Sequence, residues 1–176
     1  MKFSETALNG AFLIQIERIT DDRGWFGRAW CQDEFRLNGL NPNMVQLNTG
    51  FSRARGTLRG MHYQLPPSAE AKFVRCTRGA LFDVIVDLRD GSATEGKWSG
   101  IQLTPESGLM LYVPEGFAHG YQTLEDDTEM YYLTSAPYDR HAARGVRHND
   151  PAFGIQWPLP VSVISEADMQ WPDFKT

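Results

Sequence analysis

A succession of short extended segments separated by turns restricts the fold of this chain more than any other feature. β-branched and aromatic residues form short runs, and turn residues such as Gly79 and Gly91 recur between them about every ten residues. Many short strands with hardly any helix are typical of an antiparallel sandwich or barrel. The expected strands cover residues 11–16, 45–52, 72–77, 81–88, 98–103, 109–113, 120–123 and 129–135, and residues 56–64 should contain another that runs into a pocket.

Helix is expected only in short segments, and the end of the chain is irregular. Residues 33–40 are the best helix, with Asp33 as a possible N-cap and Gly39 near its end. In the last forty residues, prolines interrupt any regular element at Pro137, Pro151, Pro158, Pro160 and Pro172. An ordered wrap is expected there, because a solvated tail would not carry the apolar side chains of Phe153, Ile155, Trp157 and Ile164.

Length and composition favour one globular domain over residues 1–176. The chain is 41% hydrophobic and 22% charged, and its formal net charge of -5 argues against broad nucleic-acid affinity. The first residues lack a signal-peptide pattern and no run reaches transmembrane length. Cys31 and Cys76 have no metal-site spacing and are expected to be free buried thiols. We therefore expect a soluble, cytoplasmic protein without a membrane partner.

The alternation of side chains in two strands indicates a polar interior. Within residues 129–135, Tyr132 shares a face with Met130 and Thr134, so only one of the adjacent tyrosines faces a barrel lumen. Within residues 81–88, Asp83 lies opposite the apolar face formed by Phe82, Val84, Val86 and Leu88. A carboxylate in the middle of such a strand is costly unless it is paired or hydrated.

Residues 108–119 follow the pattern G-x5-P-x-G-x2-H, which resembles the second motif of the cupin superfamily of jelly-roll proteins. A hairpin with a structural histidine is the alternative explanation of this pattern. Metal-binding cupins need several convergent ligands, but the partner segment here offers His62 as its only histidine beside His119. No metal is therefore expected.

The order of motifs along the whole chain identifies a family. The segments are DRGWF (22–26), QLN (46–48), LRGMHYQ (58–64), KFVR (72–75), DVIVDLR (83–89), PEGFAHG (114–120), NDP (149–151), WP (157–158) and SEAD (165–168), with Tyr132 and Tyr138 between them. Together they closely resemble the dTDP-4-dehydrorhamnose 3,5-epimerase family of cupin-fold sugar-nucleotide epimerases. The resemblance covers residues 10–172 and implies an all-β, cupin-like jelly-roll barrel.

The resemblance also implies an activity. The family inverts carbons 3 and 5 of a nucleotide-linked 4-keto-6-deoxyhexose without a metal or redox cofactor, by removing a proton next to the ketone and returning one to the opposite face. His62 matches the family's base, Asp168 the carboxylate that orients it, Tyr132 the acid and Lys72 the cation near the oxyanion. These residue types suit proton transfer near neutral pH and stabilisation of an enolate.

Each of these four residues has a structural alternative. His62 could cap a strand, Tyr132 could be core, and Lys72 could be a solvated charge at a strand edge. Asp168 has the strongest alternative, because residues 165–168 resemble a helix capping box.

The resemblance assigns substrate binding to Arg23, Phe26, Gln46, Asn48, Arg59, His119 and Tyr138. Arginine forks suit a diphosphate, and aromatic rings suit a base or a sugar; ordinary surface arginines and packing aromatics are the alternative. In the family the segment around Arg23 commonly reaches the neighbouring subunit's site, which implies a homodimer. Two departures from the family pattern, Arg28 in place of a glutamate and a longer, more basic segment at 48–56, leave the nucleotide base and the sugar open.

The sequence is compatible with other activities, and it raises one question about the strand that carries His62. A relative that inverts only one carbon would use the same base, and a metal-dependent cupin oxygenase or a non-catalytic sugar-binding cupin are further alternatives. Arg59 and His62 lie three residues apart, so a regular strand would direct them to opposite faces. Both reach one pocket only if the strand twists or bulges, and Gly60 between them is the expected place.

Overall fold

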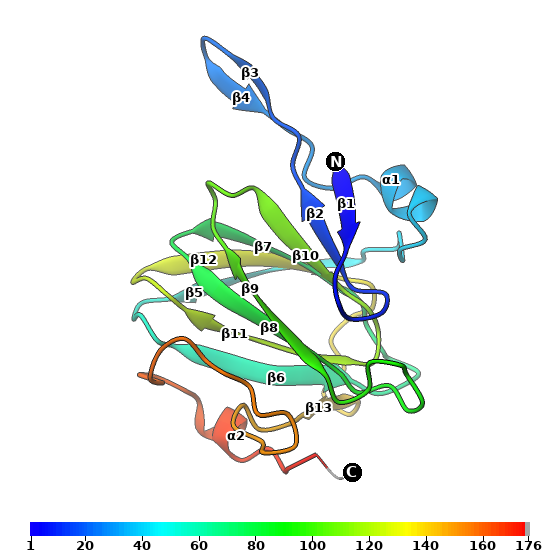
Figure 1. Cartoon of the computed structure of the whole chain (residues 1–176), viewed down its shortest axis with the longest axis vertical. Helices are drawn as coiled ribbons and strands as arrows, with labels where there is room; N and C mark the ends of the chain where they lie inside the picture. Colours follow the sequence, from blue (N-terminus) through cyan, green and yellow to red (C-terminus); the bar gives the residue numbers. More distant parts are fainter. Residues whose placement is uncertain (175–176) are drawn as a thin grey trace.

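Two antiparallel sheets packed face to face form the body of the protein (Figure 1), as seen in a computed structural model that describes residues 1–174. The first sheet has six strands in the order β1-β2-β10-β7-β12-β5, namely Lys2–Glu5, Phe12–Gln15, Leu109–Val113, Lys72–Arg78, Thr128–Thr134 and Gln46–Ser52. The second has five in the order β13-β6-β11-β8-β9, namely Ala143–Gly145, Leu58–Gln64, Phe117–Thr123, Leu81–Asp87 and Trp98–Leu103. The expected all-β jelly-roll architecture is confirmed.

Apolar side chains that alternate along the strands fill the space between the two sheets. Val74 and Leu111 of the six-stranded sheet belong to one buried cluster with Leu81, Ile85 and Phe117 of the five-stranded sheet. The same alternation leaves Asp83 on the inner face of β8, between Leu81 and Ile85. The core therefore joins the two sheets, and a few polar side chains, among them Lys72, Asp83 and His119, are buried beside it.

The helix α1 (Gln32–Leu37) covers the outer face of the six-stranded sheet. Phe35 is fully buried and packs edge-on against Phe73, with ring centroids 5.0 Å apart. The helix begins earlier than expected: Cys31 occupies the N-cap position without a side-chain bond. The prediction that Asp33 caps it is wrong, because Asp33 lies in the first turn and pairs with Arg36 at 2.6 Å.

The segment after β13 wraps the outer face of the five-stranded sheet, as the apolar residues of this region indicated. Phe153 and Ile155 are buried against Val84 and Val86 of β8. The wrap ends in the short helix α2 (Glu166–Met169), which lies under β6 in Figure 1. The path of this segment brings α2, which lies near the C-terminal end of the chain, into contact with β6.

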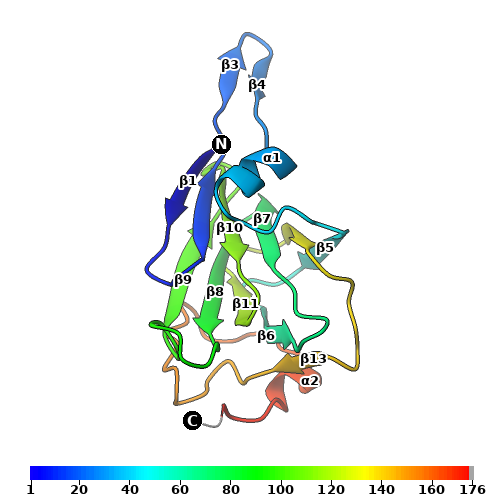
Figure 2. The ribbon, with the colours of Figure 1, turned by 90° about the vertical axis from the view of Figure 1, so that its right-hand side faces the viewer.

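A hairpin formed by β3 (Ile19–Asp21) and β4 (Gly24–Phe26) projects away from both sheets (Figures 1 and 2). Ile19 and Phe26 are 71% and 72% exposed, and Trp25 is also exposed. Neither helix within residues 1–174 has the length and hydropathy needed to cross a membrane.

Candidate active site

A cavity of about 980 Å³ opens between the two sheets. Its walls come from β6 and β11 of the five-stranded sheet, from β5, β7 and β12 of the six-stranded sheet, and from the segment around α2. Its volume is in the range that binds small molecules and cofactors.

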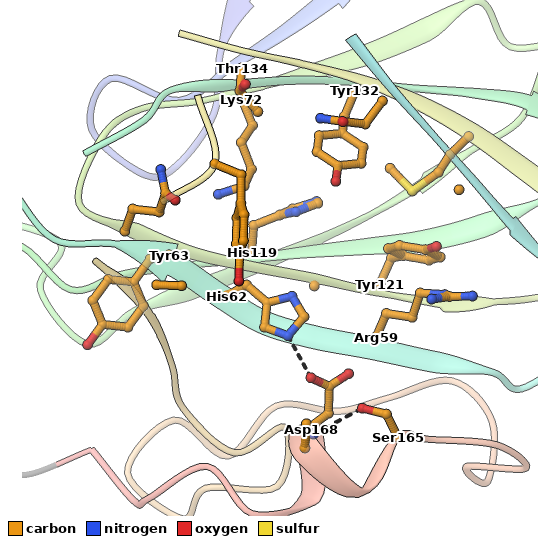
Figure 3. A pocket seen from close by; sticks show the side chains of 18 of the residues that line it. Arg59, His62, Tyr63, Lys72, His119, Tyr121, Tyr132, Thr134, Ser165 and Asp168 are labelled. Carbon is orange, nitrogen blue, oxygen red and sulfur yellow. Dashed lines mark hydrogen bonds and ion pairs between the residues drawn. The ribbon is translucent and has the colours of Figure 1, made fainter. Parts of the chain in front are cut away.

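His62 of β6 is bound to Asp168 of α2 on one wall of this cavity (Figure 3). The Nε2 atom of His62 lies 2.6 Å from Oδ1 of Asp168, and the carboxylate is buried while the imidazole remains open to the cavity. The edge of Trp171 faces the imidazole, with ring centroids 6.2 Å apart. A carboxylate in this position fixes the ring and its tautomer.

Asp168 is itself held by two further contacts. Its Oδ2 atom accepts a hydrogen bond of 3.2 Å from the Gly60 backbone N–H, and its own N–H donates to Oγ of Ser165 at 3.1 Å. Burial raises the pKa of Asp168, but the hydrogen bonds from His62, Gly60 and Ser165 outweigh it and hold that pKa below its usual value. Ser165 therefore caps the helix through the backbone N–H of Asp168, while the carboxylate of Asp168 contacts His62 and Gly60, so the two roles use different atoms of the residue.

A bulge at Gly60 turns both Arg59 and His62 toward the cavity. On β11, His119 pairs with His62 and Tyr121 pairs with Arg59, so the register shifts by one residue between these pairs. Gly60 has a φ of 120°, and a Cβ atom there would lie 2.6 Å from Cα of Gly120. The expected irregularity is confirmed at the expected residue, and only glycine fits its close approach.

Tyr132 enters the cavity from the opposite sheet. It shares the inner face of β12 with Met130 and Thr134, which also line the cavity, while Tyr131 points outward, as the alternation predicted. Burial raises the pKa of Tyr132, Glu70 raises it further and Arg59 opposes the change. A hydroxyl that stays protonated thus faces the wall that carries His62 (Figure 3).

Lys72 lies near Tyr132 and is buried in an ion pair. Its Nζ atom lies 2.6 Å from Oε1 of Glu70, and the two side chains are 6% and 10% exposed. Both residues line the cavity. Lys72 is therefore not a solvated charge at a strand edge.

His119 and Asp83 form a second buried histidine–carboxylate pair. The Nε2 atom of His119 lies 2.9 Å and 3.0 Å from the two carboxylate oxygens. Burial raises the pKa of Asp83, and the contact with His119 offsets only part of this effect. Asp83 thus has the partner that its place in the strand required, and His119 presents its ring to the cavity.

The expected binding residues of β5 and β6 lie together along the same cavity. Gln46 donates to Asn48 at 2.8 Å and accepts from the N–H of Tyr138 at 3.3 Å. Arg59 donates to Oγ of Ser52 at 3.3 Å and to the carbonyl of Phe51 at 3.1 Å. These contacts orient polar groups near one end of β5 and a guanidinium near the other, along the length of the cavity.

Arg23 and Phe26 are absent from the cavity wall among residues 1–174. Both lie on the projecting β3–β4 hairpin, and Arg23 is paired with its neighbour Asp21. The hairpin points away from the sheets (Figure 2), so these two residues do not reach the cavity of their own chain, and their assignment to substrate binding in a neighbouring subunit stays a prediction.

Several residues line the cavity that the sequence did not single out, among them Glu70, Tyr121 and Trp171. Tyr121 lies two residues after His119 on β11, so strand alternation places both on one face and could have identified it. Glu70 precedes β7, which begins at Lys72, so alternation within the strand does not extend to it. Nothing local in the sequence indicates Trp171, which reaches the cavity through the path of the wrap.

The arrangement can remove and return protons on opposite sides of a bound ring. A histidine held by a carboxylate lies on one wall, and a protonated phenol with a nearby ammonium lies on the other. Among residues 1–174, no group of three or more His, Cys, Asp or Glu side chains is placed to hold a metal ion.

Comparison with known proteins agrees with the family resemblance seen in the sequence motifs. The sequence model of the family described as dTDP-4-dehydrorhamnose 3,5-epimerase matches residues 5–176. A dTDP-4-dehydrorhamnose 3,5-epimerase of Sinorhizobium fredii is 45% identical over 173 residues, which cover 98% of this chain and 89% of the relative.

Solved structures agree with the sequence comparisons. The crystal structure of dTDP-4-dehydrorhamnose 3,5-epimerase from Elizabethkingia anophelis superimposes with a TM-score of 0.95 at 37% identity, over 99% of this chain and 96% of that one. A 3'-monoepimerase from Streptomyces bikiniensis, in complex with dTDP-quinovose, superimposes with a TM-score of 0.87 at 32% identity, over 96% and 85% of the two chains.

Proposed function

The chain belongs to the dTDP-4-dehydrorhamnose 3,5-epimerase family, and from this membership we propose how its own residues invert carbons 3 and 5 of a nucleotide-linked 4-keto-6-deoxyhexose. The family consists of isomerases. Residues 1–176 form one domain for this reaction. The observation that supports the scheme best is the His62–Asp168 pair facing Tyr132 across the cavity.

His62 is the base. It takes the proton from the carbon next to the ketone, and the electrons of the broken C–H bond pass to the ketone oxygen to form an enolate. Asp168 orients the imidazole and stabilises its charged form. The ammonium of Lys72 stabilises the negative oxygen.

Tyr132 is the acid. It donates its proton to the carbon from the opposite face, which inverts the configuration, and the enolate returns to the ketone. His62 then releases its proton to water and Tyr132 takes one from water, so that the same cycle at the second carbon next to the ketone gives the double inversion. The scheme requires no metal and no redox cofactor.

The nucleotide end of the substrate binds along β5 and β6. Arg59 contacts the diphosphate, because its planar fork matches phosphate oxygens and it is already held by Ser52. Gln46, Asn48, His119 and Tyr138 supply polar and aromatic contacts for the rest of the ligand.

The active form is a homodimer in which the β3–β4 hairpin reaches the partner's cavity. In support of this, the hairpin exposes Ile19 and Phe26 to solvent, and the outer face next to the edge strand β5 exposes Leu47, Phe51 and Tyr131. Apolar side chains grouped in this way are typical of surfaces that become buried in an oligomer. In such a dimer Arg23 and Phe26 would serve the neighbouring active site.

The protein acts in the cytoplasm. Its two cysteines, Cys31 and Cys76, are free, which suits a reducing compartment. Cys31 is only half-buried rather than buried as expected.

A second candidate function is the inversion of one carbon only. This candidate is supported by the similarity to a 3'-monoepimerase, which superimposes with a TM-score of 0.87. The difference depends on how the enolate ring lies against Tyr132, since the base is the same.

Isotope exchange tests these proposals. The protein is incubated in heavy water with dTDP-4-keto-6-deoxyglucose, and deuterium is located by NMR. Label at carbons 3 and 5 is the expected result, and label at one carbon would favour the single epimerase. Ligand binding without exchange would indicate a sugar-binding protein, and a stoichiometric metal in elemental analysis would revive the metal-dependent alternative.

The base assignment has its own test. The variant His62→Ala should abolish exchange at both carbons. Exchange at a near-native rate in this variant would contradict the assignment.

A further inference from the structure

Glu70 is a buried carboxylate in the cavity for which the reaction scheme has no role. It lies just before β7, and its Oε1 atom is 2.6 Å from Nζ of Lys72. Its side chain is 10% exposed and lines the same cavity as Lys72 and Tyr132. Burial of a carboxylate is costly, so its retention inside the cavity needs a reason beyond filling space.

Lys72 and Tyr132 are neighbours on one face of the six-stranded sheet. Lys72 pairs with Thr134 across β7 and β12, and Val74 pairs with Tyr132. Because side chains alternate, Lys72, Tyr132 and Thr134 share the inner face, and such diagonal neighbours lie about 7–8 Å apart. Glu70 therefore pairs with an ammonium whose residue is a diagonal neighbour of Tyr132 on the inner face of the sheet.

The charged and titratable side chains that surround the cavity with Tyr132 come from several elements. They are Lys72 and Glu70 at the start of β7, Arg59 and His62 on β6, His119 and Tyr121 on β11, and Asp83 on β8 behind His119. Arg59 is the cation that favours loss of the phenolic proton, because it lowers the pKa of Tyr132. Of the carboxylates, Glu70 is the one that acts on Tyr132: after burial, it contributes most to raising the pKa of that hydroxyl.

We propose that Glu70 is a positioning residue that holds the ammonium of Lys72 against the cavity wall and supplies the negative charge that keeps Tyr132 in its donor form; the inference rests on the proposed function. Without Glu70, the negative charge that opposes ionisation of the phenol would be lost, while the guanidinium of Arg59, which favours the ionised form, would remain. Tyr132 would then lose at lower pH the proton that it must donate. The ammonium would also be free to change its position relative to the oxyanion.

A titration of Tyr132 tests the charge effect without any turnover. The chain has six tyrosines, so the phenolate absorbance of each protein is compared with that of the same protein carrying Tyr132→Phe. The difference curve for Glu70→Gln should move to lower pH by roughly half a unit or more. The matched control is Glu129→Gln, because Glu129 lies on β12 but bonds to Thr77 outside the cavity; its difference curve should stay in place.

Kinetics test the positioning effect. In the exchange assay, Glu70→Gln should lower kcat about tenfold with KM within about twofold of the native value. The basic limb of its pH profile should move in the same direction as the titration. In a Lys72→Met background the same change should have little further effect, because residues that act through one another are not additive.

Three results would overturn the proposal. A rise in KM alone would make Glu70 a substrate contact. Lower thermal stability with native kinetics and an unchanged titration would make it a purely structural residue. Equal effects in the native and Lys72→Met backgrounds would separate it from Lys72. If the native protein showed no exchange, the proposed function would fail, and the titration would still decide whether Glu70 acts on Tyr132.

Discussion

The Oδ1 atom of Asp168 lies 2.6 Å from Nε2 of His62, although 106 residues separate the two in the chain. The backbone N–H of Asp168 is bound at the same time to Oγ of Ser165. The carboxylate of Asp168 therefore orients the imidazole of His62, and its backbone N–H is part of the helix cap. These two roles can be removed one at a time.

Asp168→Asn removes the charge that orients and stabilises the imidazole. We expect the exchange rate to fall by a factor on the order of 10² or more, the range found for acid–base groups. The control, Ser165→Ala, removes the cap and costs about 1 kcal/mol of stability, yet it should leave most of the exchange. If both variants lost activity equally, Asp168 would act only through the helix.

The stability of the fold should depend on pH through Asp168. Burial raises the pKa of this carboxyl, but its hydrogen bonds lower it more, so its pKa in the folded state lies below the unfolded value of about 3.9. The folded state then binds fewer protons, and the stabilisation is complete above about pH 4 and is lost as the pH falls through the folded pKa. Urea unfolding between about pH 5 and pH 2 should show the native protein losing its advantage over Asp168→Asn. A constant difference over that range would contradict the prediction.

Tyr132→Phe removes the proposed acid without emptying its place in the sheet. Exchange should slow or become restricted to one carbon, because the enolate can still form on the His62 side. Binding of dTDP, measured by calorimetry, should stay within about twofold. Tyr131→Phe is the matched control, since Tyr131 points outward from the same strand. Native double inversion in Tyr132→Phe would exclude the acid role.

Gly145→Ala should disturb the packing of Trp171. A Cβ atom at Gly145 would lie 2.4 Å from the Trp171 ring, and that ring packs edge-on to His62. We expect a loss of about 1–3 kcal/mol in urea unfolding together with slower exchange. In a Trp171→Ala background the clash is gone, so Gly145→Ala should cost much less there. Equal costs in both backgrounds would show that the indole is not the obstacle.

Mixing two defective variants tests whether Arg23 serves the partner's cavity. Arg23→Ala lacks the hairpin cation, and His62→Ala lacks the base. In a mixed dimer one site would combine an intact base with an intact hairpin, so equal mixing and reassembly should restore about a quarter of native activity by statistics. Activity no higher than the average of the two variants would place Arg23 outside the neighbouring site.

The strands of the body could be predicted because their signals are local. Alternation placed Tyr132 inside and Tyr131 outside, and the structure agrees. The strand β13 was missed because Ala143, Arg144 and Gly145 have no strand preference of their own; pairing with β6 imposes their extended conformation.

The candidate site was predictable to the extent that its residues fall within the family's motifs. His62, Lys72, Tyr132 and Asp168 all line the cavity. The local sequence could not give the direction of the hairpin that carries Arg23, although the family resemblance implied that this segment reaches a neighbouring subunit. Trp171 was missed for the same reason, since its neighbours His62 and Gly145 are distant in the chain.

The groups that exchange protons belong to different layers of the sandwich: His62 to the five-stranded sheet, Tyr132 and Lys72 to the six-stranded one. Side chains such as Val74, Ile85 and Leu111 determine the thickness of the buried core. This thickness therefore determines the distance between the two cavity walls, into which a sugar ring must fit. Because such cores are close-packed, one methyl group gained or lost can tilt one layer against the other. An evolving lineage could change the stereochemistry of its product in this way while its acid and base remained untouched.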